Sequence, residues 1–193
     1  MHGILKHTVA VAAIVVLASC TPTDDRAADT LATDSATAAA TAPVTVTATA
    51  KAEVRDAAGV VLGTLIVSDA GGGVSLSGML HGVSPGEHAI HIHTVGSCEA
   101  PDFGSAGGHW NPTNRQHGTD NPDGPHAGDL SNITVGSDSM ATLEQVTPGG
   151  MLQGESGLLD ADGASVVIHE TADDYRTDPS GNSGDRIACG VLG

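Results

Sequence analysis

The chain has few large aromatic rings and few positive charges. Aromatic residues make up 2% of its 193 residues and glycine occurs 26 times, so any core must consist mainly of Val, Leu, Ile and Ala. Seven Lys and Arg stand against 23 Asp and Glu, which gives a formal net charge of -16. A protein that binds nucleic acid neutralises phosphates with basic side chains, so this composition excludes that class. An anionic substrate would need a local positive site.

Long apolar runs are also missing. The run from Val9 to Leu17 is too short for a permanent membrane span, but it follows Lys6 and has the size of a signal-peptide core. It leads into the letters L-A-S-C at Cys20, which resemble the lipobox of bacterial lipoproteins. We therefore expect a lipoprotein signal peptide over residues 1–19 and a lipid on Cys20, which would anchor the protein to the bacterial cell envelope, periplasmic or outer surface. An ordinary secretory signal with an incidental cysteine is the alternative.

Residues 20–43 differ in composition from residues 44–193. After Cys20, the first of these segments consists largely of Thr, Ala, Asp and Ser, and has almost no large apolar side chain. Such a segment cannot recover the entropy lost on ordering, so we expect a flexible tether that carries the lipid. The folded domain is then expected over residues 44–193.

Within residues 44–193, apolar and polar residues alternate in short runs separated by Gly-rich turns, and no segment has a helical period. The runs cover residues 44–54, 61–67, 74–80, 130–135, 139–146, 164–170 and 187–192. Alternation with a period of two is typical of strands that are buried on one face. The pattern predicts an all-β domain, an antiparallel sandwich or barrel.

A long polar stretch interrupts these strands from His91 to Asp129. Because side chains alternate along a strand, His91 and His93 should point to the same side. Paired histidines on a strand are often only part of a polar face. Here the same stretch and a later strand add His109, His117, His126, Asp129 and His169. Neutral imidazole suits copper or zinc, and several histidines with one carboxylate are typical of zinc, so we expect bound metal to order the stretch.

The cysteines are three in number, Cys20, Cys98 and Cys189. If Cys20 carries a lipid, the other two remain as a pair, and export to an oxidising compartment favours a disulfide between them. Two free structural thiols are the alternative.

Five motifs follow one another in the second half of the chain. They are G-E-H-A-I-H-I-H at 86–93, S-A-G-G-H-W-N-P at 105–112, H-A-G-D-L at 126–130, V-V-I-H-E at 166–170 and G-N-S-G-D-R-I-A-C-G at 181–190. Together they resemble copper/zinc superoxide dismutase of the bacterial exported type, and the resemblance covers residues 44–193. It implies an eight-stranded Greek-key β-barrel, a form of β-sandwich, with long metal-binding and electrostatic loops.

The resemblance also implies roles for individual residues. Copper would be held by His91, His93, His109 and His169, and zinc by His109, His117, His126 and Asp129. One copper and one zinc per chain would then share His109 as a bridge. Cys98 and Cys189 match the disulfide of the family.

Two further matches concern groups around the metals. Arg186 would lie beside copper and attract the anion, although a surface salt bridge is the plainer interpretation of an arginine. Asp173 would link a copper ligand to a zinc ligand, with Asp174 as the competing candidate. By strand parity His88 is expected to be structural, and His81 is expected to be a turn residue.

The implied activity is dismutation of superoxide to oxygen and hydrogen peroxide, with Arg186 and His109 as catalytic residues. The alternative is an envelope lipoprotein that binds copper and zinc without catalysis. The implied partners are superoxide as substrate and the membrane through Cys20. The resemblance is compatible with a monomer or a homodimer.

Overall fold

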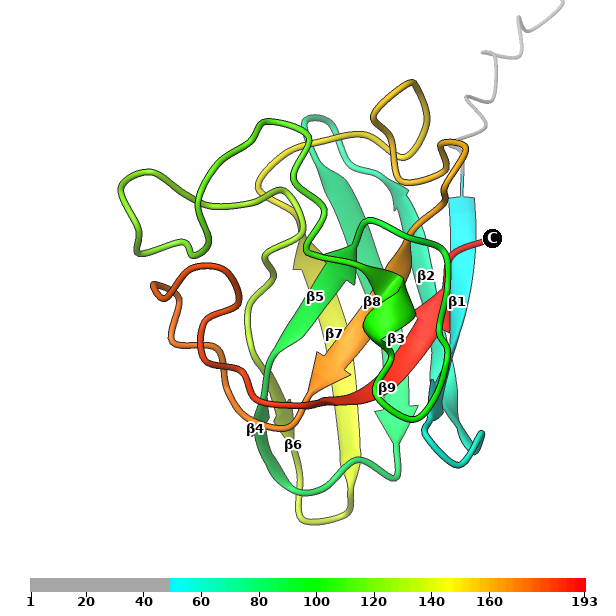
Figure 1. The fold of residues 1–193 in the computed structure, drawn as a ribbon. Coiled ribbons are helices and arrows are strands. Elements are labelled where there is room, and N and C mark those ends of the chain that lie inside the picture. The colour runs from blue at the N-terminus through cyan, green and yellow to red at the C-terminus, as the bar shows by residue number, and fades with distance from the viewer. Residues whose placement is uncertain (1–48) are drawn as a thin grey trace, which may run out of the picture. The chain divides into compact units, whose positions relative to one another are not determined.

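A computed structural model describes residues 49–193, and these residues form nine strands and one short 3-10 helix (Figure 1). The strands are β1 (Thr49–Asp56), β2 (Val61–Asp69), β3 (Val74–His81), β4 (Gly86–His88), β5 (Ile90–His93), β6 (Ile133–Val135), β7 (Met140–Val146), β8 (Ser165–His169) and β9 (Arg186–Val191). The helix is η1 (Gly104–Ala106). The expected signal peptide, the tether, Cys20 and residues 44–48 lie outside the described residues.

The strands follow the alternation of the sequence. In β1, Ala50, Ala52 and Val54 are buried while Lys51 and Glu53 are exposed. Hydrophobic burial of one face therefore fixes the register of the strand, since a shift by one residue would expose every buried side chain.

Residues 49–193 contain no helix with the length and hydropathy of a membrane span.

The sheet closes on itself. Seven strands pair antiparallel in the order β5-β8-β9-β1-β2-β3-β7, and β4 pairs with β6. The strands β4 and β5 form one continuous run that is interrupted only at Ala89. Its first part, which ends at His88, pairs with β6, and its second part, which begins at Ile90, pairs with β8. The Gln145 side chain of β7 exchanges two hydrogen bonds of 2.9 Å with the backbone of Ser131, just before β6. Counted with β4 and β5 as one, the barrel has the eight expected strands.

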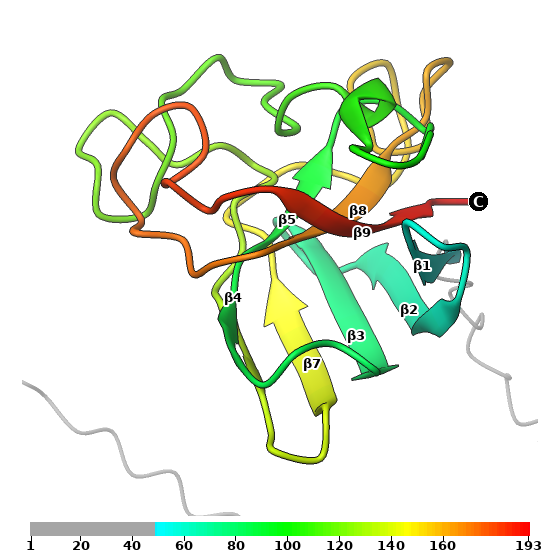
Figure 2. The ribbon, with the colours of Figure 1, turned by 60° about the horizontal axis from the view of Figure 1, so that its bottom comes forward.

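The connections are those of a Greek key. The strands β4/β5, β6 and β7 are consecutive neighbours, and β7 lies beside β3, the strand that precedes them in the chain. Figure 2 shows β3 and β7 side by side below the long loops. The all-β prediction is confirmed. The prediction that His81 is a turn residue is wrong, because His81 pairs with Met140 as the last residue of β3 and the turn begins at Gly82.

Aliphatic side chains fill the interior, as the composition predicted. The largest fully buried ones include Leu65, Leu76, Leu80, Ile90 and Ile92. Two of the few aromatic rings are also buried, because the loops fold over them: Trp110 joins this main core, and Phe103 packs in a second cluster.

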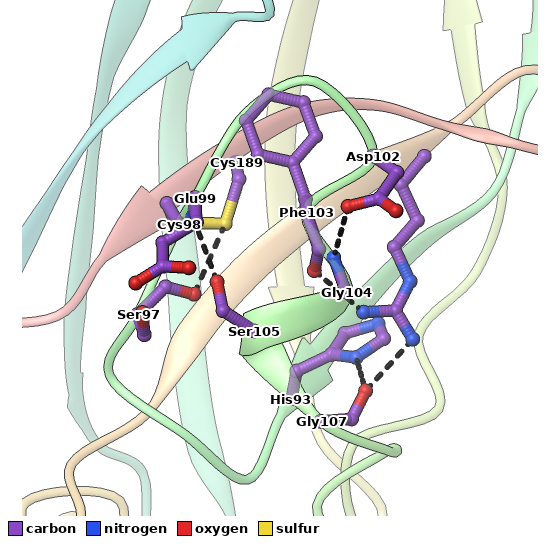
Figure 3. Close-up of a disulfide and its surroundings, with 11 residues drawn as sticks. His93, Ser97, Cys98, Glu99, Asp102, Phe103, Gly104, Ser105, Gly107 and Cys189 are labelled. Atoms are coloured by element: carbon purple, nitrogen blue, oxygen red, sulfur yellow. Dashed lines mark hydrogen bonds between the residues drawn. A yellow bond between two sulfur atoms is a disulfide. The ribbon is translucent and has the colours of Figure 1, made fainter.

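The second cluster surrounds a disulfide between Cys98 and Cys189, which confirms the predicted pair. The two Cα atoms are 5.7 Å apart and 91 residues separate them in the chain. Figure 3 shows the bond beside Phe103 and Ser105. It ties the loop after β5 to β9.

We expect the double variant Cys98→Ser with Cys189→Ser to lose about 4 to 5 kcal/mol of unfolding free energy, because the cross-link closes a loop of 91 residues in the unfolded chain. Urea denaturation of the metal-loaded protein, with and without the bond, measures this loss. A loss below about 1 kcal/mol would contradict the expectation.

Candidate metal centre

The expected ligand residues come from the strands β5 and β8 and from the long loop that follows β5. His91 and His93 belong to β5 and His169 ends β8, the strand that pairs with it. The loop of residues 94–132 returns along the other edge of β5. There the Ile92 N–H donates to the Gly128 carbonyl at 3.0 Å, and the Trp110 N–H donates to the Ile92 carbonyl at 2.8 Å. The loop histidines are thereby brought next to those of β5.

Gly128 permits this close approach. A Cβ atom at that position would collide with the Ile92 carbonyl oxygen and touch the Trp110 nitrogen. Any other residue would push the loop away from the edge of β5, and with it Asp129, which follows directly. The glycine of the H-A-G-D motif is therefore required by packing.

A first donor set is formed by four buried histidines. His91, His93, His109 and His169 each offer a ring nitrogen, and these four atoms lie within 4.8 Å of one another. In each ring one buried nitrogen lacks a hydrogen-bond partner among the described residues: His91 Nδ1, His93 Nε2, His109 Nε2 and His169 Nε2. Unpartnered buried polar atoms are unfavourable, so four of them converging on one point fit a bound cation.

The opposite nitrogen of three of these rings is held by the protein. His93 Nδ1 donates to the Gly107 carbonyl at 3.0 Å (Figure 3). His91 Nε2 lies 2.7 Å from Asp173 Oδ2, and His169 Nδ1 lies 3.1 Å from the Ser183 hydroxyl. These contacts fix the orientation of each ring and leave the other nitrogen free for a metal.

A second donor set surrounds one carboxylate oxygen. Asp129 Oδ1 lies 2.9 Å from His109 Nδ1, 3.1 Å from His117 Nδ1 and 3.2 Å from His126 Nδ1. A carboxylate oxygen has about two lone-pair sites, so it cannot accept a hydrogen bond from each of the three imidazoles. Three nitrogens and one oxygen are a donor set typical of zinc. The other oxygen, Asp129 Oδ2, accepts the backbone N–H groups of Gly118 and His126, each at 2.9 Å.

His109 belongs to both sets. Its Nδ1 faces Asp129, its Nε2 is the unpartnered atom that faces the first set, and its side chain is 4% exposed. One imidazole can hold an ion at each nitrogen when it is deprotonated. The residue expected to bridge two metals thus lies between two donor sets.

Asp173 connects the two sets a second time. Its two oxygens contact His91 Nε2 at 2.7 Å and His117 Nε2 at 3.0 Å, and the carboxylate is fully buried. Gly181 leaves room for it, since a Cβ there would overlap Asp173 Oδ1. Asp174, the competing candidate, is turned away and accepts hydrogen bonds from Thr177 within its own loop.

Asn132 is a positioning residue that the sequence analysis missed. Its side chain accepts the Asp173 N–H at 2.8 Å and donates to the Asp173 carbonyl at 3.0 Å. The Asn132 N–H in turn donates to the Tyr175 hydroxyl at 2.8 Å. No short sequence signal marks this pairing, because 41 residues separate Asn132 from Asp173.

Arg186 lies at the mouth of the first set. Its guanidinium donates to the carbonyls of Phe103 and Gly107, both at 2.7 Å. The Gly107 carbonyl also accepts from His93, so one oxygen fixes both side chains. Arg186 lines an open pocket of about 380 Å³ together with His93, His109 and His169. None of the ion pairs within residues 49–193 includes Arg186, so the surface salt bridge is not found.

Two other arginines, Arg176 and Arg115, do not line this pocket. Arg176 pairs with Asp120 at 3.3 Å, and both side chains are more than half exposed. Arg115 donates to the Gly124 carbonyl at 2.8 Å. The expected structural role of His88 agrees with its contacts, since it is buried between the carbonyls of His169 and Ser84.

Burial controls the protonation of the histidines. It lowers the pKa of His93 to about 2, of His169 to about 3 and of His109 to about 4. Burial would also lower the pKa of His117, but hydrogen bonds that its ring donates to Asp129 and Asp173 outweigh it and raise the pKa to about 9. For both carboxylates, burial is likewise outweighed by hydrogen bonds, which hold their pKa values below the usual range.

These shifts predict how the stability of the metal-free chain depends on pH. Below pH 6.5 the unfolded chain gains protons that His93, His109 and His169 cannot accept while buried, so stability falls as the pH falls. His117 works in the other direction: its contribution is lost as the pH rises from 6.5 through about 9. We therefore expect maximal stability at about pH 6 to 7, measured as urea midpoints of the metal-free, disulfide-bonded protein. Midpoints that stay constant or rise steadily from pH 5 to 9 would contradict this.

Comparison with known proteins agrees with this geometry. The model of the family described as copper/zinc superoxide dismutase (SODC) matches residues 61–192. The chain belongs to this family. The copper/zinc superoxide dismutase of Caulobacter vibrioides is 44% identical over 147 residues, which are 74% of this chain and 84% of the relative.

Solved structures of the family share the fold. A SOD-like protein from Bacillus subtilis matches with a TM-score of 0.70 at 40% identity, covering 74% of this chain and 97% of that one. The Cu/Zn superoxide dismutase from Brucella abortus matches with a TM-score of 0.62 at 28% identity, covering 76% and 100%. One of these two is named only SOD-like, so the residues of each member's own site must decide its activity.

Proposed function

We propose that this chain catalyses the dismutation of superoxide, in which two superoxide anions and two protons yield one oxygen and one hydrogen peroxide. A single observation carries the proposal: the two nitrogens of His109 face two separate buried donor sets. Copper would be held by His91, His93, His109 and His169, and zinc by His109, His117, His126 and Asp129. The first set offers only imidazole, and the second adds the carboxylate that zinc commonly takes.

When bound, copper supplies the one-electron redox chemistry, and zinc, which does not change its oxidation state, stabilises the loop and the bridge. The chain itself supplies the fixed geometry. Asp173 holds His91 and His117 by their outer nitrogens, and the Gly107 carbonyl holds His93. Such hydrogen bonds keep ligand nitrogens oriented, so little rearrangement is needed when the substrate arrives.

His109 is placed to carry a proton. Its Nδ1 is held against Asp129, whereas its Nε2 has no hydrogen-bond partner among the described residues. If Nδ1 holds zinc in place of a proton, Nε2 is the one ring nitrogen left to carry a proton, and it would give this proton to reduced dioxygen, which accounts for one of the two protons that the reaction consumes. The second proton would come from solvent through the pocket lined by His93, His109 and Arg186.

Arg186 would attract the substrate. The chain as a whole carries a formal charge of -16, which repels superoxide. A half-buried guanidinium at the pocket wall provides a local positive charge where the copper set opens. Charge focused in a pocket can raise association rates by about 10 to 1,000-fold.

The test is the rate of superoxide dismutation by the full chain, loaded with zinc and with increasing amounts of copper. The proposal expects the rate to rise in proportion to bound copper up to one per chain, at constant zinc. Full occupancy of both metals with an intact disulfide but no dismutation would contradict it. That result would favour an envelope lipoprotein that binds copper and zinc without catalysis.

The cellular location is a further part of the proposal, supported by the residues before Cys20. The apolar run and the lipobox-like letters L-A-S-C support cleavage after Ser19 and lipid attachment to Cys20. Mass spectrometry of the N-terminal peptide from bacterial membranes should find a lipid on Cys20, and Cys20→Ser should move the protein to the soluble fraction. An unmodified Cys20 in a soluble parent protein would contradict the anchor.

A further inference from the structure

Two methionines and a histidine lie together on the outer face of the barrel, on β3 and β7. Met79, His81 and Met140 are all exposed, and the two methionines are 51% and 40% exposed. Their neighbours Leu80 and Ala141 point the opposite way and are buried in the core. None of the donor residues of the metal centre belongs to β3 or β7.

The register of the sheet brings these three side chains together. His81 is paired directly with Met140, and Met79 is paired with Thr142, two residues further along on the same face. Directly opposed Cβ atoms, here those of His81 and Met140, lie about 4.5 to 5.5 Å apart, and residues two apart on one strand, here Met79 and His81, lie about 7 Å apart, within reach of long side chains. The flexible thioethers of Met79 and Met140 can therefore both approach the His81 ring.

Backbone hydrogen bonds hold this corner of the sheet. The Gly82 N–H donates to the Ser139 carbonyl at 2.9 Å, directly beyond the His81–Met140 pair. The Met140 N–H donates to Asp138 Oδ1 at 3.2 Å. Figure 2 shows the end of β3 and the start of β7 at the bottom of the view, away from the loop of residues 94–132 at the top. The backbone is thus ordered before any ligand binds, which reduces the entropy cost of binding.

The donor chemistry points to one kind of ion. Thioether sulfur is a soft ligand that selects Cu(I), and imidazole also suits copper. Zinc prefers thiolate, imidazole and carboxylate ligands, and magnesium and calcium prefer oxygen ligands. A site with two thioethers therefore binds these ions weakly. The net charge of -16 favours the approach of any cation.

We propose that Met79, His81 and Met140 form a binding site for one Cu(I) ion, separate from the metal centre. Thr142 occupies the fourth corner of the same face and offers only a hydroxyl, so the site has three donors, two sulfurs and one nitrogen. The site holds copper in its reduced state on the surface of the barrel. It does not depend on the proposed catalytic activity, because its donors belong to different strands.

The test is a titration of the full chain with Cu(I), supplied anaerobically as its acetonitrile complex against bicinchoninate, after the metal centre has been filled with copper and zinc. The parent should bind one Cu(I) per chain more than the double variant Met79→Leu with Met140→Leu, and one more than His81→Gln. All three side chains are exposed, so these variants keep the core intact. Met151→Leu is the matched control, since Met151 is 62% exposed and lies outside β3 and β7, and it should bind as the parent does.

A second readout identifies the atoms. In protein labelled with ¹³C at the methionine methyl groups, Cu(I) should shift the signals of Met79 and Met140 and leave that of Met151 in place, and Zn²⁺ at the same concentration should shift none of them. Equal Cu(I) uptake by the parent and either site variant would overturn the proposal. So would unshifted signals of Met79 and Met140, or an equal response to Zn²⁺.

Discussion

Alanine in place of His93 is expected to reduce superoxide dismutation to less than about one hundredth of the parent rate, while zinc remains at one per chain. His93 supplies one of the four nitrogens of the copper set and does not belong to the zinc set. Loss of a group that only supports a ligand already costs about 10 to 100-fold in metal affinity or activity, so loss of the ligand itself should cost more. Dismutation and metal content are measured on the same sample.

Two comparisons make this result specific. His93→Gln nearly fills the same volume without the ligating nitrogen, so it should lose activity as alanine does. Thr64→Ala changes an exposed residue on β2 and should keep both metals and the parent rate. The assignment of His93 to copper would be wrong if His93→Ala kept copper and at least half of the parent activity.

The variant Arg186→Gln is expected to lower the rate at limiting superoxide by about tenfold or more, with both metals still bound. Arg186 donates hydrogen bonds to two backbone carbonyls and to no side chain of the metal ligands, so its removal changes the charge of the pocket and keeps all of the donors. Because steering by charge is screened by ions, the remaining activity should also depend less on salt. Dismutation rates at several ionic strengths measure both effects.

The matched control is Arg55→Gln, which removes the same charge from the exposed end of β1, where Arg55 pairs with Glu53. Its rate should stay within about twofold of the parent, since Arg55 does not line the pocket of the copper set and its exposed charge is screened by ions in solution. Equal losses in the two variants would mean that only net charge matters, and would contradict a local role for Arg186.

The strands could be predicted from the sequence because their pattern is local. Alternation in β1 is imposed by burial of one face, and the continuous apolar run Val166, Val167 and Ile168 of β8 is imposed by burial of both faces. The break at Ala89 could not be predicted in this way, because it arises where one run changes its partner from β6 to β8. His81 was misread for a related reason: its pairing with Met140 joins residues that are 59 positions apart in the chain.

The ligand residues of the metal centre could be predicted from the sequence, but most of the groups that orient these ligands could not. His91, His93 and the later histidines stand out in the sequence, because histidine is an uncommon residue and only a few residue types bind zinc. The groups that orient them are mostly backbone atoms, such as the Gly107 carbonyl, which no side-chain pattern reveals. Asn132 is an ordinary loop residue in the sequence, and only the folded chain brings it to Asp173.

His109 is proposed to lie between two different ions. Anomalous X-ray scattering from crystals of the metal-loaded chain, recorded on both sides of the copper and zinc absorption edges, tests it directly. We expect a copper peak among His91, His93 and His169 and a separate zinc peak among His117, His126 and Asp129, with His109 in contact with both. One shared peak, or two peaks of which only one touches His109, would contradict it.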